Sequence, residues 1–428
     1  ATSSQLFFWP GRNDNYNDRP LSRYVDYVHQ NYTLAETKED YINLVDNQRL
    51  ICIGDVHGDL WALQDFLEIS GVYDRQLDEW IGGNTIVVQC GDILDRGVEE
   101  LACYTLLCKL SQQAIHTDGK VILLIGNHEA MNSMGLFQYA INDMEHEHKI
   151  GLAVDEELET PNWRIQYAKN QPSRWSSYEP GGLLASSLLA NMKVAIRVGR
   201  TVCVHAGLRP SHLKDNGGIE GMNKQFRDWI TLESDGEYDN KNFNIINNYN
   251  PIHYNHRGQY NDPIRQPYID AEKRQTYYME SIPTFLKAGP GAVGPIWMRD
   301  YSYPHDQPPK DENGSTTRMI EETLLLLDCD RMIMGHTIQR QINCVLHGRA
   351  WRIDVGASRG CGSGTPEVLE IIHKNTDINT DFGFGIDSHN SNNNNQNKDQ
   401  DQVSILTSKG RIPAHERFID VTAVADFL

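Results

Sequence analysis

Short apolar runs recur along the chain and are separated by polar segments that contain glycine. Five such runs are four to six residues long and mostly apolar: 50–53, 85–89, 120–125, 201–204 and 331–334. Continuous apolar runs of this length are typical of strands that are buried on both faces, as in parallel sheets. The pattern therefore predicts five core strands.

Two longer segments have a different periodicity. Residues 60–69 and 101–110 carry apolar side chains at the spacing of one helix face, including Leu101, Leu106 and Leu110. This spacing predicts an amphipathic helix in each segment. Alternation of strands and helices favours an α/β layered fold.

Chemically active side chains follow the first three runs directly. They lie in Gly54-Asp55-Val56-His57-Gly58-Asp59, Gly91-Asp92-Ile93-Leu94-Asp95-Arg96-Gly97 and Gly126-Asn127-His128-Glu129. Carboxylate oxygen and imidazole nitrogen are ligands of hard or borderline divalent cations, and strand ends can converge on one point. The ordered series predicts a two-metal site, with glycines that allow sharp turns and close backbone approach.

Two further histidines follow the remaining runs. His205 comes after the fourth run, and His336 comes after the fifth. Taken singly, each histidine fits a hydrogen-bonded core position as well as a metal ligand. Because both stand at predicted strand ends, we expect five strand ends to face one site.

The three motifs resemble the GDxHG, GDxxDRG and GNHE series of the calcineurin-like metallophosphoesterases, and within them the phosphoprotein phosphatases. The resemblance spans roughly residues 49–372, and the wording of 126–132, 294–299 and 353–356 is most similar to the Shewanella-like branch. No Ser-Ala-Pro-Asn-Tyr segment stands near the C-terminus, so the active-site tyrosine of the major eukaryotic phosphatases has no counterpart. The family implies a central two-sheet β-sandwich flanked by helices, with a dimetal site at strand ends.

The resemblance also implies two divalent or trivalent metal ions, drawn from Mn, Fe and Zn, with one carboxylate bridging them. Oxygen and imidazole ligands accept these metals alike. The implied ligands are Asp55, His57 and Asp92 for one ion, and Asp92, Asn127, His205 and His336 for the other.

The implied catalytic residues lie beside these ligands. His128 would act as the general acid that protonates the leaving oxygen, with Asp95 orienting its imidazole. Arg96 would bind the phosphate, because a planar guanidinium matches two phosphate oxygens. Arg299, in the Trp-x-Arg segment, would be a second phosphate clamp, and the alternative is a surface ion pair with Asp300 or another neighbour.

The order of the candidate ligands bears on domain organisation. They run from Asp55 to His336, so we expect one catalytic domain over residues 49–428 and an N-terminal extension, residues 1–48, packed on its core. Two polar segments predict surface insertions at about 234–266 and 388–402, the second of low complexity.

Composition limits the possible substrates and the cellular location of the protein. The net charge of −19 argues against nucleic acid as a substrate, and no apolar run reaches the length of a membrane span. The eight cysteines form no CxxC pair and favour a reduced, cytoplasmic protein. The sequons at Asn31 and Asn313 keep a processed organellar or secretory chain as the alternative.

The expected function is a metal-dependent phosphoprotein phosphatase. The resemblance implies hydrolysis of phosphomonoesters on Ser/Thr or Tyr by direct attack of a hydroxide shared by the two metals. One alternative is a dinucleoside-polyphosphate or other nucleotide hydrolase, which uses a similar motif series. Another is a pseudophosphatase that binds phosphoproteins without turnover, although no expected ligand is missing.

Overall fold

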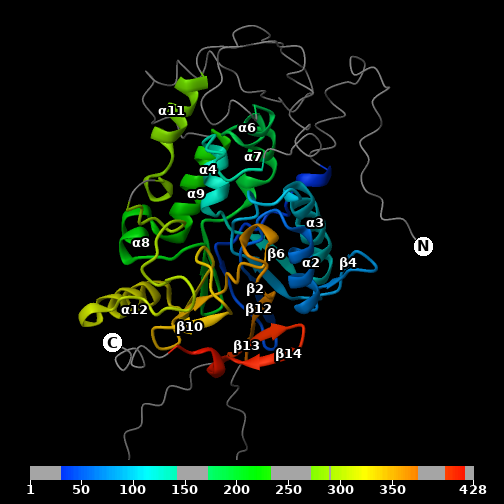
Figure 1. The fold of residues 1–428 in the computed structure, drawn as a ribbon, viewed down its shortest axis with the longest axis vertical. Helices are drawn as coiled ribbons and strands as arrows, with labels where there is room; N and C mark the ends of the chain where they lie inside the picture. The colour runs from blue at the N-terminus through cyan, green and yellow to red at the C-terminus, as the bar shows by residue number, and fades with distance from the viewer. Residues whose placement is uncertain (1–29, 142–171, 233–270, 289–290, 375–400, 420–428) are drawn as a thin grey trace, which may run out of the picture.

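The computed structural model describes residues 30–141, 172–232, 271–288, 291–374 and 401–419 of the 428-residue chain. Within these ranges, two six-stranded mixed sheets form the centre of the molecule and helices surround them (Figure 1). The α/β layered architecture expected from the sequence is confirmed.

The sheet that carries the first three motifs has the strand order β14-β13-β12-β2-β5-β6. Its strands are β2 (Arg49–Ile53), β5 (Ile86–Gln89), β6 (Lys120–Leu123), β12 (Glu367–Ile372), β13 (Gln402–Thr407) and β14 (Gly410–Pro413). Strands β2, β5 and β6 run parallel, and every residue of β5 is buried. Their carboxyl ends therefore lie at the same edge of the sheet.

The second sheet has the order β1-β7-β8-β9-β11-β10. It contains β1 (Tyr41–Ile42), β7 (Ala195–Val198), β8 (Thr201–Val204), β9 (Arg331–Met334), β10 (Asn343–Val345) and β11 (Ala350–Arg352). Strands β8, β9 and β11 are parallel, so His205 and His336 follow strands that end at one edge. A short hairpin of β3 (Tyr73–Asp74) and β4 (Glu79–Trp80) lies outside both sheets.

The two sheets pack face to face through their central strands. Cys52 on β2 and Cys203 on β8 are fully buried, and their Sγ atoms lie 3.8 Å apart. At one edge the sheets are joined by the backbone, because the Ile125 amide donates to the Lys193 carbonyl at 2.8 Å. The expected two-sheet sandwich is thereby confirmed, and its joined edges bring both sets of strand ends together.

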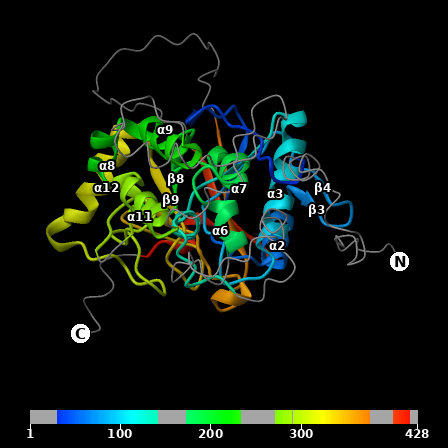
Figure 2. The ribbon, with the colours of Figure 1, turned by 90° about the horizontal axis from the view of Figure 1, so that it is seen from above.

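Helices lie around the sandwich. They are α2 (Leu60–Ile69), α3 (Glu100–Ala114), α4 (Asn127–Ser133), α6 (Pro172–Tyr178), α7 (Leu183–Ser187), α8 (Pro210–Asn216), α9 (Gly218–Thr231), α11 (Ala271–Ser281) and α12 (Ser315–Leu327). Helices α2 and α3 lie side by side on one flank, and α8 and α12 lie on the other (Figures 1 and 2). Helix α2 begins after Asp59, whose carboxylate accepts the Ala62 amide at 3.2 Å.

The predicted elements agree with the structure in type and differ at some ends. Helix α2 has the predicted bounds, whereas α3 begins one residue earlier and ends four residues later than expected. Strand β6 ends at Leu123, and the next residue, Leu124, pairs with Lys193, which precedes β7 of the other sheet. The sequence does not show that change of partner.

The described part of the N-terminal extension, residues 30–48, packs on the core. Tyr32 and Leu34 are buried, and β1 adds an edge strand to the second sheet. The predicted insertion at 234–266 lies outside the described residues, as does 388–400. At the end of the second segment, Asp401 pairs with Arg331 at 2.6 Å and Gln402 begins β13.

Candidate active site

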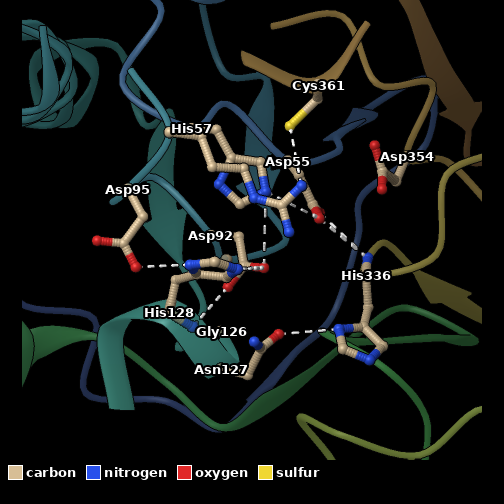
Figure 3. A network of polar contacts seen from close by, with 12 residues as sticks. Asp55, His57, Asp92, Asp95, Gly126, Asn127, His128, His336, Asp354 and Cys361 are labelled. Carbon is tan, nitrogen blue, oxygen red and sulfur yellow. Dashed lines mark hydrogen bonds and ion pairs between the residues drawn. The ribbon is translucent and has the colours of Figure 1, made fainter. Parts of the chain in front are cut away.

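The sequence-predicted ligands come from five strand ends and meet in one cluster, and Figure 3 labels all of them except His205. Asp55 and His57 follow β2, and Asp92 follows β5. Asn127 is the first residue of α4, four residues after the end of β6. His205 and His336 follow β8 and β9.

The first group surrounds the carboxylate of Asp92. His57 Nε2 lies 4.0 Å from Asp55 Oδ2 and 3.9 Å from Asp92 Oδ2. His128 Nε2 lies 3.8 Å from the same Asp92 oxygen, so this imidazole also borders the group. All four side chains are buried.

The second group shares Asp92 with the first. His205 Nε2 lies 3.3 Å from Asp92 Oδ2 and 3.0 Å from Asn127 Oδ1. His336 Nδ1 lies 2.8 Å from the same amide oxygen. Asp92 therefore stands between two clusters of ligand-type atoms, as a bridging residue must.

The residues fit metal ions by their donor types and by their spacing. Separations of 2.8–3.3 Å between nitrogen and oxygen are those of atoms that share one cation at about 2.1 Å. The ring atoms that face away are fixed, because Nδ1 of His57 contacts the Leu94 carbonyl at 2.9 Å and Nδ1 of His205 contacts that of Cys90 at 2.7 Å. These contacts leave each Nε2 facing the cluster as a ligand atom.

Several of these residues adopt a left-handed backbone that non-glycine residues rarely use. The φ angles of His57, Asp92 and His336 are 47°, 57° and 64°. Such conformations cost about 1–3 kcal/mol each and persist only where the surroundings fix them. Here the amides of Val56 and His57 both donate to the Asp92 carbonyl, at 3.0 and 2.9 Å, which ties the two loops together.

Glu129, the last residue of the third motif, is hydrogen-bonded to the backbone of the same loops. Its fully buried carboxylate accepts the amides of Asp92, Leu94 and Gly126 at 2.9, 3.1 and 2.8 Å. A carboxylate that accepts several amides fixes their relative positions. The sequence alone predicts no role for Glu129, although it is the last residue of the GNHE motif at 126–129.

Two glycines make room for the ligand carboxylates. A Cβ atom at Gly126 would collide with the Asp92 carboxylate, and one at Gly335 would collide with that of Asp55. Both positions therefore require a residue without a side chain. For Gly126 this is the close approach that the sequence predicts, whereas Gly335 adds a position not singled out there.

The cluster gathers acidic groups with little solvent around them. Burial raises the pKa of Asp55 well above its usual value, and the charges of Asp354 and Asp92 raise it further. Burial also raises the pKa of Asp354, to about 6. Burial opposes ionisation of Asp92 as well, but His205, His128 and His57 hold its pKa well below the usual range. The site thus concentrates negative charge that bound cations would compensate.

His128 and Asp95 form a buried pair beside the ligand cluster. His128 Nδ1 lies 2.6 Å from Asp95 Oδ2, and Asp95 is fully buried (Figure 3). Burial lowers the pKa of His128, but Asp92 and Asp95 outweigh it and raise the pKa. The pairing predicted between these two residues is therefore present.

A cleft of about 520 Å³ opens above the cluster. Its lining includes Asp92, His128, Arg96, Arg299 and Tyr139. The Arg96 guanidinium lies 5.3 Å from the centroid of the Tyr139 ring, and its Nη1 donates to Cys361 Sγ at 3.6 Å. Both arginines named from the sequence therefore border the cleft.

Arg299 does not pair with its sequence neighbour. Asp300 is held by Arg209, at 2.7 and 2.9 Å, whereas Arg299 Nη1 donates to Thr337 Oγ1 at 2.6 Å. Thr337 follows His336, so this contact places the guanidinium next to the ligand cluster. The alternative of an Arg299–Asp300 ion pair is not what the structure shows.

Sequence reasoning missed residues that lack a metal-binding pattern of their own. Asp354 lines the cleft after β11, and its carboxylate accepts the Gly356 amide at 2.8 Å. The strand-end position of Asp354, after the run of β11, was the available signal. Arg174 and Glu100 border Asp95 but carry no motif that marks them.

All eight cysteines are free thiols. Seven of them are buried, and Cys361 is partly exposed next to Arg96. Burial raises the pKa of Cys361 to about 11, so its thiol form predominates.

Comparison with known proteins agrees with this geometry. The family model for calcineurin-like phosphoesterases matches residues 48–279, which include the first three motifs and His205. The chain belongs to the calcineurin-like phosphoesterases, and it is a metal-dependent phosphoester hydrolase.

The predicted branch within this family is also confirmed. The chain is 31% identical to Shewanella-like protein phosphatase 2 of Arabidopsis thaliana over 348 residues, covering 76% of this chain and 75% of the relative. It is 42% identical to Shewanella-like protein phosphatase 1 of Plasmodium berghei over 99 residues, covering 23% of this chain and 27% of that protein.

Among solved structures, the cold-active protein-tyrosine phosphatase of a psychrophilic Shewanella species has a similar fold. The TM-score is 0.52 at 18% identity, and the match covers 79% of this chain and 82% of that one. At this identity the likeness shows the fold alone. Among the described residues, no helix combines the length and apolar character needed to cross a membrane.

Proposed function

We propose that this protein is a phosphoprotein phosphatase that hydrolyses phosphomonoesters on Ser/Thr or Tyr side chains with the help of two metal ions. The observation that carries the proposal is the shared position of Asp92, which lies within 4 Å of His57, His128 and His205. The relatives named as protein phosphatases support the substrate class.

We assign the metal ligands as the family resemblance implies. Asp55, His57 and Asp92 would hold one ion, and Asp92, Asn127, His205 and His336 would hold the other. Bound cations of the Mn, Fe or Zn type lower the pKa of water and stabilise charge on phosphoryl oxygens. Asp92 keeps its carboxylate oriented because its Oδ1 accepts the His128 amide at 2.9 Å.

His128 would donate the proton that the leaving oxygen needs. Its Nδ1 contacts Asp95, so its Nε2 is the atom that faces the cleft. Asp95 would fix the ring orientation and favour the protonated imidazole. The burial of Asp95 excludes water that would otherwise compete for that contact.

Arg96 and Arg299 would hold the phosphate from above. Both side chains border the cleft, and both carry planar guanidinium groups that can bind two oxygens. Tyr139 packs against Arg96 and lies 5.1 Å from His128, measured between ring centroids. The phosphoryl group would thus lie between the ligand cluster and two cationic side chains.

The substrate class is tested with purified protein on two substrate sets. A panel of phosphoserine, phosphothreonine and phosphotyrosine peptides is compared with diadenosine polyphosphate, and Asp92→Asn protein controls for contaminating hydrolases. We expect peptide hydrolysis that the variant lacks. Rapid cleavage of diadenosine polyphosphate with inert peptides would favour the nucleotide hydrolase. Tight phosphopeptide binding without turnover would favour a pseudophosphatase.

A further inference from the structure

The contacts of Asp95 extend beyond His128 into a buried polar network. Its Oδ2 contacts His128 Nδ1, while its Oδ1 accepts from Asn132 Nδ2 and from Arg174 Nη2, both at 3.1 Å. The Asp95 amide donates to Glu100 Oε1 at 2.5 Å. Both oxygens of the carboxylate are therefore engaged, so the group has no freedom to rotate.

Arg174 contacts all three of the acceptor side chains in this network, which belong to Asn132, Glu100 and Asp95. Its Nε donates to Asn132 Oδ1 at 2.5 Å, and its Nη1 donates to Glu100 Oε2 at 2.6 Å. Its Nη2 reaches Asp95 Oδ1 and also Glu100 Oε1, at 2.8 Å. One planar guanidinium can serve three neighbours in this way, whereas a lysine ammonium is a point charge on a flexible stem.

The network is sealed from solvent and holds two anions. Arg174 and Glu100 are each 1% exposed, and Asp95 is 0% exposed. The Arg174 guanidinium also lies 5.6 Å from the ring centroids of Phe137 and Tyr178. Burying a carboxylate is unfavourable unless charged or hydrogen-bonding groups compensate, and Arg174 provides such compensation to both Asp95 and Glu100.

We infer that Arg174 is a positioning residue for proton donation by His128. By holding Asp95 Oδ1, it fixes the carboxylate in the orientation in which Oδ2 contacts His128 Nδ1, and it thereby directs His128 Nε2 into the cleft. This inference rests on the proposed role of His128 as general acid. It assigns α6 a part in the site, although none of the three motifs lies in that helix.

The test uses aryl phosphates whose leaving phenols differ in pKa. Arg174→Met should lower kcat for phenyl phosphate by about 10–100-fold, the usual effect of losing a supporting partner. For nitrophenyl phosphate, whose leaving group needs little protonation, the loss should stay below about threefold. Metal content, measured by elemental analysis, should stay at the wild-type level. In a His128→Asn background, Arg174→Met should have no further effect on the leaving-group dependence.

Two further variants separate positioning from loss of stability. Arg417→Met removes another buried arginine, which pairs with Glu367 at 2.9 and 3.1 Å away from the cleft. It should lower the melting temperature and leave the leaving-group dependence as in the wild type. Arg174→Lys keeps the charge without the fork and should change the leaving-group dependence in the same direction as Arg174→Met. If Arg174→Met does not fold, Arg174→Lys is the variant that tests whether Arg174 positions Asp95.

A folded Arg174→Met or Arg174→Lys protein with the wild-type leaving-group dependence would overturn the inference. So would an equal change in the Arg417→Met control. The proposed function fails in a different way: His128→Asn would then lose activity equally on phenyl and nitrophenyl phosphate, or the wild-type protein would hydrolyse neither.

Discussion

The floor and the rim of the cleft are built differently. The floor consists of Asp55, His57, Asp92 and Asn127, with His205 buried behind them, and none of these residues is more than 5% exposed. The rim consists of Arg96, Tyr139 and Arg299, which stand on loops, and Tyr139 is 47% exposed.

The difference assigns separate tasks to the two regions. Floor residues follow core strands and are tied by backbone contacts such as those from Val56 and His57 to Asp92. They cannot adapt, so their arrangement suits ions of fixed geometry. On the rim, Arg299 is held by Thr337 and Arg96 is held by Cys361 and the Tyr139 ring, and such side-chain contacts on loops suit a phosphate that enters and leaves. Changes to the floor should therefore remove metal, and changes to the rim should weaken substrate binding alone.

Asp92→Asn should have the largest effect, because the carboxylate shared by both groups loses its charge. We expect metal occupancy to fall and turnover of nitrophenyl phosphate to drop by more than about 10³-fold. Elemental analysis and steady-state kinetics on the same preparation provide the measurement. A variant that keeps two metals and near-wild-type rates would exclude Asp92 as the bridging residue.

His128→Asn sharpens the comparison, since His128 borders the floor without being an assigned ligand. The variant should retain its metals and lose about 10²–10⁴-fold in kcat on substrates with poor leaving groups, the range for a general acid. Its defect should shrink for nitrophenyl phosphate. Loss of metal together with activity would instead make His128 a floor ligand.

Arg299→Ala should have a smaller effect, confined to binding. We expect kcat/KM to fall by roughly 10–100-fold, or about 1.4–2.7 kcal/mol of transition-state stabilisation, with metal content intact. Inhibition by inorganic phosphate should weaken in parallel. If neither quantity changes, Arg299 does not clamp phosphate and Arg96 alone serves on the rim.

Arg209→Ala provides the matched control with the smallest effect. This arginine pairs with Asp300, the neighbour of Arg299, and does not line the cleft. Because partly exposed ion pairs contribute about 0–1 kcal/mol, activity should stay within about twofold of the wild type. A larger loss in kcat/KM would show that residues outside the cleft also affect activity, so that the effect of Arg299→Ala could not be assigned to phosphate binding.

The floor was predictable from the sequence, because each of its residues follows a short apolar run. Strand ends converge in an α/β sheet, so Asp55, Asp92 and His205 could be grouped before their distances were known. The family resemblance supplied which side chain would face which ion. Element ends were less predictable, since β6 stops where Leu124 pairs with Lys193, a residue ahead of β7.

The support of Asp95 was not predictable from the sequence. Arg174 reaches this carboxylate from helix α6, which begins at Pro172, 77 positions after Asp95. Its burial depends on three-dimensional packing against Phe137 and Tyr178, and no periodicity encodes that. Long-range contacts between single side chains leave no local pattern to interpret.

The central claim is that two metal ions share Asp92, and metal reconstitution tests it most directly. Chelator-treated protein receives Mn²⁺ in measured steps while bound metal and nitrophenyl phosphate turnover are recorded on the same sample. We predict no turnover in the metal-free protein and full turnover only as the second ion per chain binds. Full activity without metal, or saturation with a single ion bound per chain, would contradict the claim.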